Sequence, residues 1–215
     1  MTAMPGCSEI IDISAPLHAH TLTYPGDPVF GRTLVKEIDD EGAGYNLSLL
    51  SMSAHCGTHI DAPRHFIAGG RCVHDISSTR WITPALVIDT GDDRMIEPRH
   101  LEGHALREGM SVLFRTRNCH DLVRNRMIER PVALTLEAAQ VLVALHVNLV
   151  GIDWLSIESG DDPSFPVHHL LLGNDVIILE TAQLHHIEAG AYTLAVFPLH
   201  LMDADGAPVR AALLR

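Results

Sequence analysis

The stretch SAHCGTHIDAPRHF, residues 53–66, holds three histidines and an aspartate, with a glycine and a proline between them. Burying ionisable groups without partners costs free energy, so an ordinary core segment would not carry so many of them. A solvated loop has no need of them either. The stretch is therefore expected to be a functional site, and we take it as the starting point for the rest of the chain.

Strand periodicity gives this stretch a chemical meaning. In an extended chain alternate side chains share a face, so His55, Gly57, His59 and Asp61 would point the same way. The glycine would give an ion or a substrate room to approach the backbone. Two imidazoles and a carboxylate suit Zn²⁺ or Mn²⁺, and a three-ligand site keeps a position for water, whose pKa such an ion lowers to about 7. The pattern predicts a divalent metal site.

Two neighbours of these ligands receive different roles. His65 follows Pro63, which breaks the strand, so its imidazole need not join the ligands and suits proton transfer. Cys56 lies on the opposite face and is interpreted as a packed thiol rather than a nucleophile. For any single histidine, a surface or hydrogen-bonded core role is the alternative.

A second cluster lies in FPVHHLLLGNDVIILE, residues 165–180. From the residues alone two interpretations stay open for His168 and Glu180. They are either metal ligands, with Glu180 delivered by an apolar strand, or the start of a helical turn and an exposed strand end.

The remaining patterns predict one β-rich α/β domain over residues 1–215, built on a mixed sheet with few helices. The clearest helix is residues 135–146, with Thr135 as its N-cap. Residues 15–30 are expected to form an ordered loop. Strands are expected in the segments 9–14, 45–55, 85–90, 111–116, 147–153, 175–180, 192–201 and 208–214, with a hairpin turn at residues 202–206.

Composition excludes several classes of protein. The formal net charge is −12, and no basic block with interleaved aromatic residues is present, so nucleic acid is not an expected partner. No apolar run is long enough to cross a bilayer, and the N-terminus lacks the features of a signal peptide, which predicts a cytoplasmic protein. The four cysteines are too scattered for a disulfide framework or a thiolate zinc site. A Gly-x-Ser-x-Gly elbow, the mark of many serine hydrolases, is absent from the sequence.

The segment HCGTHIDAPRHF, residues 55–66, resembles the His-x-Gly-Thr-His-x-Asp-x-Pro-x-His signature of the cyclase family of metal-dependent hydrolases. That family includes bacterial kynurenine formamidases and isatin hydrolases. Four further blocks in the same order are similar to family segments and extend the resemblance over essentially the whole chain: DISAPLHAHTLTYPGDPVF, LVGIDWLSIE, HHLLLGNDVIILE and FPLHLMDADGAPVRAALLR.

The resemblance implies a swivelling β/β/α fold, assembled as a homodimer or a larger homo-oligomer. It implies that His55, His59 and Asp61 bind a first metal ion, and that Asp61 bridges to a second ion held by His168 and Glu180. One or two ions per subunit are therefore expected. It also implies that His65 donates and accepts protons, and it makes His169 the less favoured ligand of the adjacent pair.

The expected reaction is hydrolysis of a C–N amide bond, as in the conversion of N-formylkynurenine to kynurenine and formate. The substrate is expected to be a small aromatic amide or lactam. Formamidases of this family tend to carry tryptophan where this chain has Tyr24, which still offers a ring to a substrate, and often alanine where it has Thr58. The alternatives are ring opening of a cyclic amide such as isatin, of an imide or of a lactone, and a non-catalytic module that binds a metal or small ligand.

Overall fold

Eight strands within residues 8–38 and 44–215, the part of the chain that this computed structural model describes, form one mixed sheet. The strand order is β1-β12-β11-β5-β7-β9-β10-β4, and β4 also pairs with β12, so seven strands close into a barrel with β1 outside. The strands β5, β7, β9 and β10 are parallel, and the other pairings are antiparallel. The bounds are β1 Ile10–Asp12, β4 His59–Asp61, β5 Ile82–Asp89, β7 Ser111–Arg115, β9 Leu149–Ile152, β10 Ile177–Glu180, β11 Gly190–Pro198 and β12 Gly206–Leu214.

Few helices accompany this sheet, which confirms the predicted β-rich mixed architecture. The helix α2 (Leu136–Ala144) begins at Thr135, whose side chain accepts a hydrogen bond from the Ala138 N–H as the predicted N-cap does. The other helical elements are α1 Cys119–Leu122, α3 Pro166–Gly173, and the 3₁₀ turns η1 Pro63–His65, η2 Val73–Asp75, η3 Ser78–Arg80 and η4 Pro98–Leu101. A small separate sheet pairs β6 (Met95–Ile96) with β8 (Ala133–Leu134).

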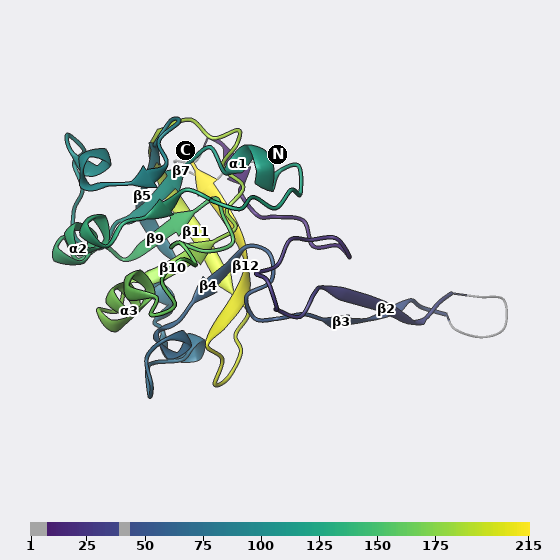
Figure 1. The fold of residues 1–215 in the computed structure, drawn as a ribbon. Helices are drawn as coiled ribbons and strands as arrows, with labels where there is room; N and C mark the ends of the chain where they lie inside the picture. Colours follow the sequence, from purple (N-terminus) through teal and green to yellow (C-terminus); the bar gives the residue numbers. More distant parts are fainter. Residues whose placement is uncertain (1–7, 39–43) are drawn as a thin grey trace.

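Two hydrophobic clusters lie on opposite sides of the central strands. Leu113 faces the cluster enclosed by the barrel, whereas Val112 and Phe114 face the cluster beneath α2 and α3, which cover the outside of the sheet (Figure 1). Burial on both faces explains the continuous apolar runs of these strands. On β4 the same alternation sends Ile60 into the barrel and turns His59 and Asp61 outward.

The predicted extended segment from residue 55 to residue 61 is wrong in its first half, because the strand begins only at His59. His55 is delivered by a turn in which the Cys56 N–H donates to the Ser53 carbonyl at 3.3 Å. Gly57 has φ +66°, and a Cβ there would lie 2.5 Å from Leu17 Cδ2. The glycine therefore serves this left-handed turn and its contact with Leu17, and not the approach of a ligand.

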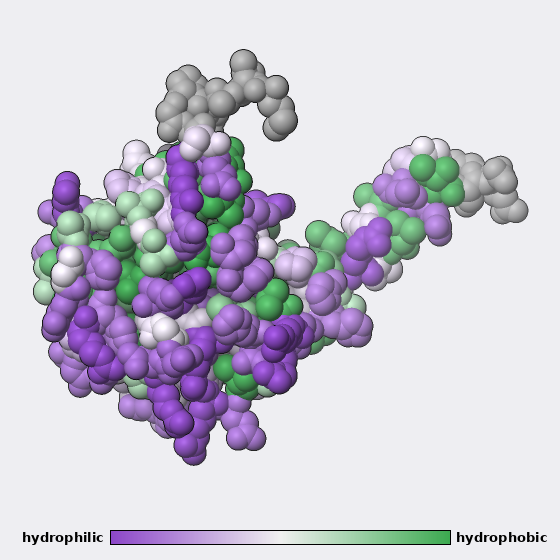
Figure 2. Space-filling model, turned by 90° about the horizontal axis from the view of Figure 1, so that it is seen from above, coloured by the Kyte–Doolittle hydropathy of each residue, from purple (hydrophilic) through white to green (hydrophobic). Residues whose placement is uncertain are grey.

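The predicted strand over residues 45–55 is shorter than expected and lies outside the barrel. β3 (Leu47–Ser51) pairs only with β2 (Gly31–Lys36) among the described residues. Together they form a two-stranded arm, residues 31–38 and 44–51, that projects from the body (Figure 1). Apolar side chains are exposed along the arm (Figure 2), including Val35, Leu47, Leu49 and Leu50.

The remaining sequence expectations concern membrane-spanning helices, the cysteines and the number of domains. Within the described ranges, no helix combines the length and apolar character needed to cross a bilayer. Cys56, Cys72 and Cys119 are buried free thiols, while Cys7 lies outside the described residues. The assignment of residues 1–215 to a single domain stays a prediction.

Thr58 connects the loop before the arm to the end of β10. Its hydroxyl accepts a hydrogen bond from the half-buried Ala15 N–H at 2.7 Å and donates one to the buried Thr181 carbonyl at 2.7 Å. Thr58→Ala leaves both backbone groups without this partner, so we expect it to lower the free energy of unfolding by about 1–3 kcal/mol. Thr58→Ser keeps the hydroxyl and should cost less. Denaturant unfolding of the metal-free variants measures the difference, and equal stabilities for Thr58→Ala and wild type would contradict this role.

Candidate metal centre

Strand register assembles the first part of the site. In the antiparallel pair β4–β10, His59 stands directly opposite Glu180. Directly opposed residues in such a pair bring their side chains within contact distance. Asp61 lies two positions further along β4, on the same outer face. The barrel wall therefore presents one imidazole and two carboxylates to a common point.

His59 has its ring orientation fixed by the backbone. Its Nδ1 donates a hydrogen bond to the Gly57 carbonyl at 2.8 Å, which leaves Nε2 facing the carboxylates. Nε2 lies 3.4 Å from Glu180 Oε2 and 3.5 Å from Asp61 Oδ1. His55 approaches from its turn, with Nδ1 2.8 Å from Asp61 Oδ1.

The predicted ligands fall into two groups that share Asp61. One ligand atom each from His55, His59 and Asp61 lie within 4.8 Å of one another, and the same holds for Asp61, His168 and Glu180. His168 comes from the first turn of α3, and its Nε2 lies 3.4 Å from Glu180 Oε1 and 3.9 Å from Asp61 Oδ2. Between the two alternatives for His168 and Glu180, this geometry favours the one in which both face Asp61.

Glu158 is a site residue that the sequence analysis missed. Its carboxylate accepts hydrogen bonds from the backbone N–H groups of Val167 at 2.8 Å and His168 at 3.2 Å, at the start of α3. It also accepts one from His168 Nδ1 at 2.6 Å. These contacts satisfy free donors of the helix terminus and turn Nε2 of His168 toward Asp61. Glu158 is the last residue of the block LVGIDWLSIE, but neither that block nor its separation of ten positions from His168 indicated a role for it.

Two buried polar atoms in the described residues show that the donor set fits a cation. His59 Nε2 and Asp61 Oδ2 are buried without any hydrogen-bond partner. Buried polar atoms of native proteins are nearly always hydrogen-bonded, and an ion is a recognised reason for an exception. The imidazole nitrogens and carboxylate oxygens of the two groups are ligands for divalent metals such as zinc or manganese.

When no cation is bound, protonated histidines offset the negative charge of the carboxylates in this cluster. Burial lowers the pKa of His59, but the nearby carboxylates of Asp61 and Glu180 outweigh it and raise the value to about 10. Burial also opposes protonation of His168, yet Glu158 and Glu180 raise its pKa to about 10. The pKa of Asp61 falls well below its usual value because the effect of His55 and His59 exceeds that of burial. At neutral pH a cation entering the site must therefore displace protons from both histidines.

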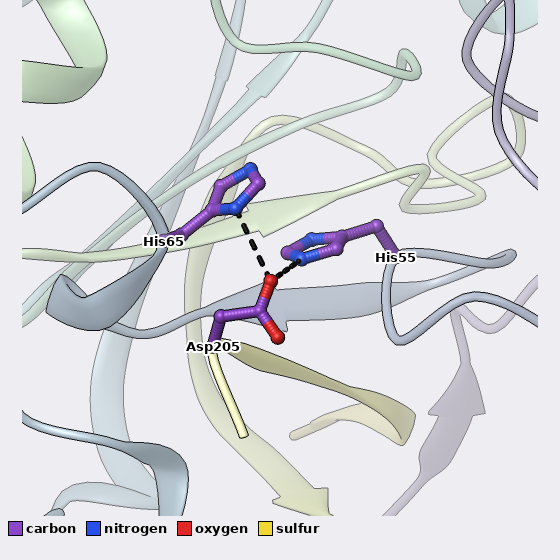
Figure 3. Close-up of side chains that lie close together, drawn as sticks. All are labelled: His55, His65 and Asp205. Carbon is purple, nitrogen blue, oxygen red and sulfur yellow. Dashed lines mark hydrogen bonds and ion pairs between the residues drawn. The ribbon is translucent and has the colours of Figure 1, made fainter. Parts of the chain in front are cut away.

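His65 stands beside the first group and is not among the ligands of either. It ends η1, and its ring stacks on that of His55 at 4.0 Å between centroids. Burial lowers its pKa, which favours the neutral imidazole. A second residue missed by the sequence analysis, Asp205, reaches one nitrogen of each ring with its carboxylate (Figure 3).

A cavity of about 170 Å³ opens over the ligand groups. Tyr24, Phe66 and Phe165 supply aromatic rings to its lining, and His65 borders it. Tyr24 sits at the start of a turn closed by the Asp27 N–H donating to the Tyr24 carbonyl at 3.0 Å, with Gly26 at φ +100°. Proline followed by glycine at the centre of this turn matches the type II pattern. The predicted ordered loop thus brings an aromatic ring to the site.

Two side chains were expected to stand apart from the ligands. His169 is exposed and belongs to neither ligand group. Cys56 is fully buried, and burial, together with the charge of Asp27, raises the pKa of its thiol, which keeps it protonated and unreactive.

Comparison with known proteins identifies the family of the chain. Residues 11–159 match the putative cyclase family, and the chain belongs to that family. It is 37% identical over 206 residues to a kynurenine formamidase of Bacillus cereus, covering 96% of this chain and 97% of the relative, and 35% identical over the same length to one of Bacillus anthracis. A solved structure described as a potential metal-dependent hydrolase with cyclase activity has a TM-score of 0.84 at 29% identity, over 96% of this chain and 97% of that one. Isatin hydrolase A from Labrenzia aggregata shares the fold, with a TM-score of 0.84 at 23% identity, over 96% and 93% of the two chains.

Removing the carboxylate behind His168 tests the second ligand group. We expect Glu158→Gln to weaken zinc binding at the group of Asp61, His168 and Glu180 by about 10–100-fold, because His168 loses the partner that orients it. Elemental analysis after dialysis against a series of buffered zinc concentrations measures the ions retained per chain. Asp162→Asn is the control, because Asp162 caps only its own loop through Ser164. Wild-type zinc retention in Glu158→Gln would show that Glu158 does not support this group.

Proposed function

We propose that the protein hydrolyses the C–N bond of an aromatic formamide, with N-formylkynurenine as the reference substrate. The observation that carries the proposal is the position of the two ligand groups, which share Asp61 beneath an aromatic-lined cavity with His65 at its edge. Full-length similarity to kynurenine formamidases supports the choice of bond and substrate.

The proposed cofactor is a divalent metal, zinc or manganese, bound as two ions per subunit. His55, His59 and Asp61 would hold one ion, and Asp61, His168 and Glu180 the other. When bound, such ions polarise a carbonyl group and make water a nucleophile at neutral pH. Two ligand groups with one shared carboxylate favour two ions over one.

The chain's own side chains supply the remaining functions. His65 is a neutral imidazole at the cavity edge, so it can take a proton from water and return it to the leaving nitrogen. The rings of Tyr24, Phe66 and Phe165 can pack on the substrate's aromatic ring and orient its amide toward the ligand groups.

Separate variants distinguish the proton carrier from the ligands. We expect His65→Ala to keep its metal while the turnover of N-formylkynurenine falls by about 10²–10⁴-fold, the usual contribution of a general acid–base group. His59→Ala should lose metal, because it removes one of three ligands of the first group. Elemental analysis and formate release measure the two effects, and the exposed His169→Ala serves as the control.

The same assay separates the alternatives. Full activity of His65→Ala would contradict its proposed role. Turnover of isatin without turnover of N-formylkynurenine would favour ring opening of a cyclic amide by the same residues. No turnover on a panel of amides, lactams and lactones, with metal bound, would favour a binding module.

We also propose that the protein is a homodimer held by its arms. An isolated two-stranded hairpin is at best marginally stable in water, and the arm has apolar side chains on both faces, because Leu49 and Leu50 are neighbours on β3. A stable interface engages about 20–30 residues a side, and the residues 31–38 and 44–51 of one arm supply more than half of that number. In a two-fold symmetric dimer each arm would pack against the other copy of the chain. The exposed apolar side chains of both arms would then be buried in one interface.

The arm also continues directly into the site. Its first strand follows the turn that carries Tyr24, and its second leads to His55. An arm held by a second copy would therefore steady both segments.

The predicted cytoplasmic location stays a prediction.

A charge placed on the arm tests the dimer. Leu47→Glu/Leu49→Glu would bury carboxylates in the proposed interface, so we expect a dimeric wild type and a monomeric variant, measured by light scattering after size-exclusion chromatography. Met127→Glu is the matched control, because Met127 on the body and Leu47 on the arm are each 45% exposed. A monomeric wild type, or an arm variant that remains dimeric, would contradict the proposal.

A further inference from the structure

One carboxylate contacts both the first predicted ligand and the predicted proton carrier. Oδ2 of Asp205 lies 2.9 Å from Nε2 of His55 and 3.4 Å from Nδ1 of His65. Figure 3 shows the carboxylate reaching both rings from the end of the β11–β12 loop, with the second nitrogen of His65 directed away from it. Among residues 8–38 and 44–215, Asp205 has the only carboxylate within ion-pair distance of His65.

Closure of the barrel holds this carboxylate in place. The Ala62 N–H donates to the Asp205 carbonyl at 2.8 Å, which fastens the loop to the end of β4. The next residue, Gly206, pairs with Asp61, and a Cβ there would lie 2.6 Å from His55 Cε1. The backbone therefore packs against the His55 ring at a point that only glycine allows, and Asp205 is presented to the rings from a fixed position.

The contacts fix which nitrogen of each ring faces Asp205. A carboxylate is an acceptor, so His55 donates from Nε2 to Asp205 and from Nδ1 to Asp61; a cation that displaced the Nδ1 proton would meet the lone pair of Nδ1 while Nε2–H stayed on Asp205. His65 faces Asp205 with Nδ1 at 3.4 Å, and a proton held on Nδ1 by this carboxylate leaves the lone pair on Nε2. The hydrogen bond made by one imidazole nitrogen sets the role of the other.

We propose that Asp205 is a positioning residue for both histidines. It holds Nδ1 of His55 ready for a cation and Nε2 of His65 ready to exchange protons with substrate. It thereby couples the first ligand group to the proton carrier through a single side chain. The His65 half of this inference rests on the proposed function, whereas the His55 half depends only on metal binding.

Nuclear magnetic resonance of zinc-loaded protein with ¹⁵N-labelled histidine tests the inference without using activity. In wild type we expect His65 to show a protonated Nδ1 and an unprotonated Nε2. In Asp205→Ala we expect the proton to distribute between the two nitrogens. Asp203→Ala, which removes a carboxylate from the same loop that contacts neither ring, should retain the wild-type pattern.

Zinc affinity and steady-state kinetics extend the test. Asp205→Ala should bind zinc at the His55 group about 10–100-fold more weakly, with the His168 group unchanged. At saturating zinc, kcat should fall by at least about 10-fold while KM changes by less than about two-fold, because Asp205 does not line the cavity. Asp205→Asn keeps the side-chain shape and one acceptor oxygen, so it should give intermediate values, and it replaces the alanine variant if that fails to fold.

The outcomes separate this inference from the proposed function. An unchanged His65 tautomer together with unchanged zinc affinity in both Asp205 variants would overturn it. If tautomer and affinity change as expected while neither wild type nor variant hydrolyses N-formylkynurenine, the positioning role stands and the proposed substrate fails.

Discussion

The pairing of β4 with its two neighbours is the constraint on which both the fold and the site depend. This strand closes the barrel, with Ile60 opposite Leu179 of β10 on one side and Ala207 of β12 on the other. Because side chains alternate along a strand, a shift of one residue would turn His59 and Asp61 into the apolar interior and Ile60 out of it. Burial of Ile60 therefore fixes the face on which the ligands stand.

Four carboxylates lie around the point where the two ligand groups meet, two facing it and two behind the histidines. Asp61 and Glu180 face that point, while Glu158 and Asp205 stand behind His168 and His55 and orient their rings. Without a cation the histidines hold protons against these negative charges, so metal binding, proton release and stability are linked. The ligand geometry depends as much on the supporting carboxylates as on the ligands.

Local patterns were sufficient to predict part of this arrangement. Alternation correctly placed His59 and Asp61 on one face, and the N-cap at Thr135 is confirmed. Family resemblance, and not the residues alone, favoured His168 and Glu180 as ligands, and the structure brings them to Asp61. The extended segment before His59 was wrong, because the positive φ of Gly57 depends on packing against Leu17, which no local pattern reveals.

Contacts between distant parts of the chain explain what could not be predicted. Asp205 meets His55 across 150 positions, and barrel closure creates that contact, since neither segment specifies it alone. Glu158 meets His168 because the chain after β9 folds back onto the start of α3. Residues 45–55 were expected as a strand leading into the motif, and β3 confirms their strand character, but β2 was not predicted, and alternation does not reveal whether a strand joins the main sheet or leaves it.

Anomalous diffraction from crystals grown with zinc or manganese tests the central claim most directly. Two anomalous peaks that flank the Asp61 carboxylate, one beside His55 and His59 and the other beside His168 and Glu180, are the predicted result. Peaks only at other side chains, or an Asp61 carboxylate turned away from bound metal, would contradict it.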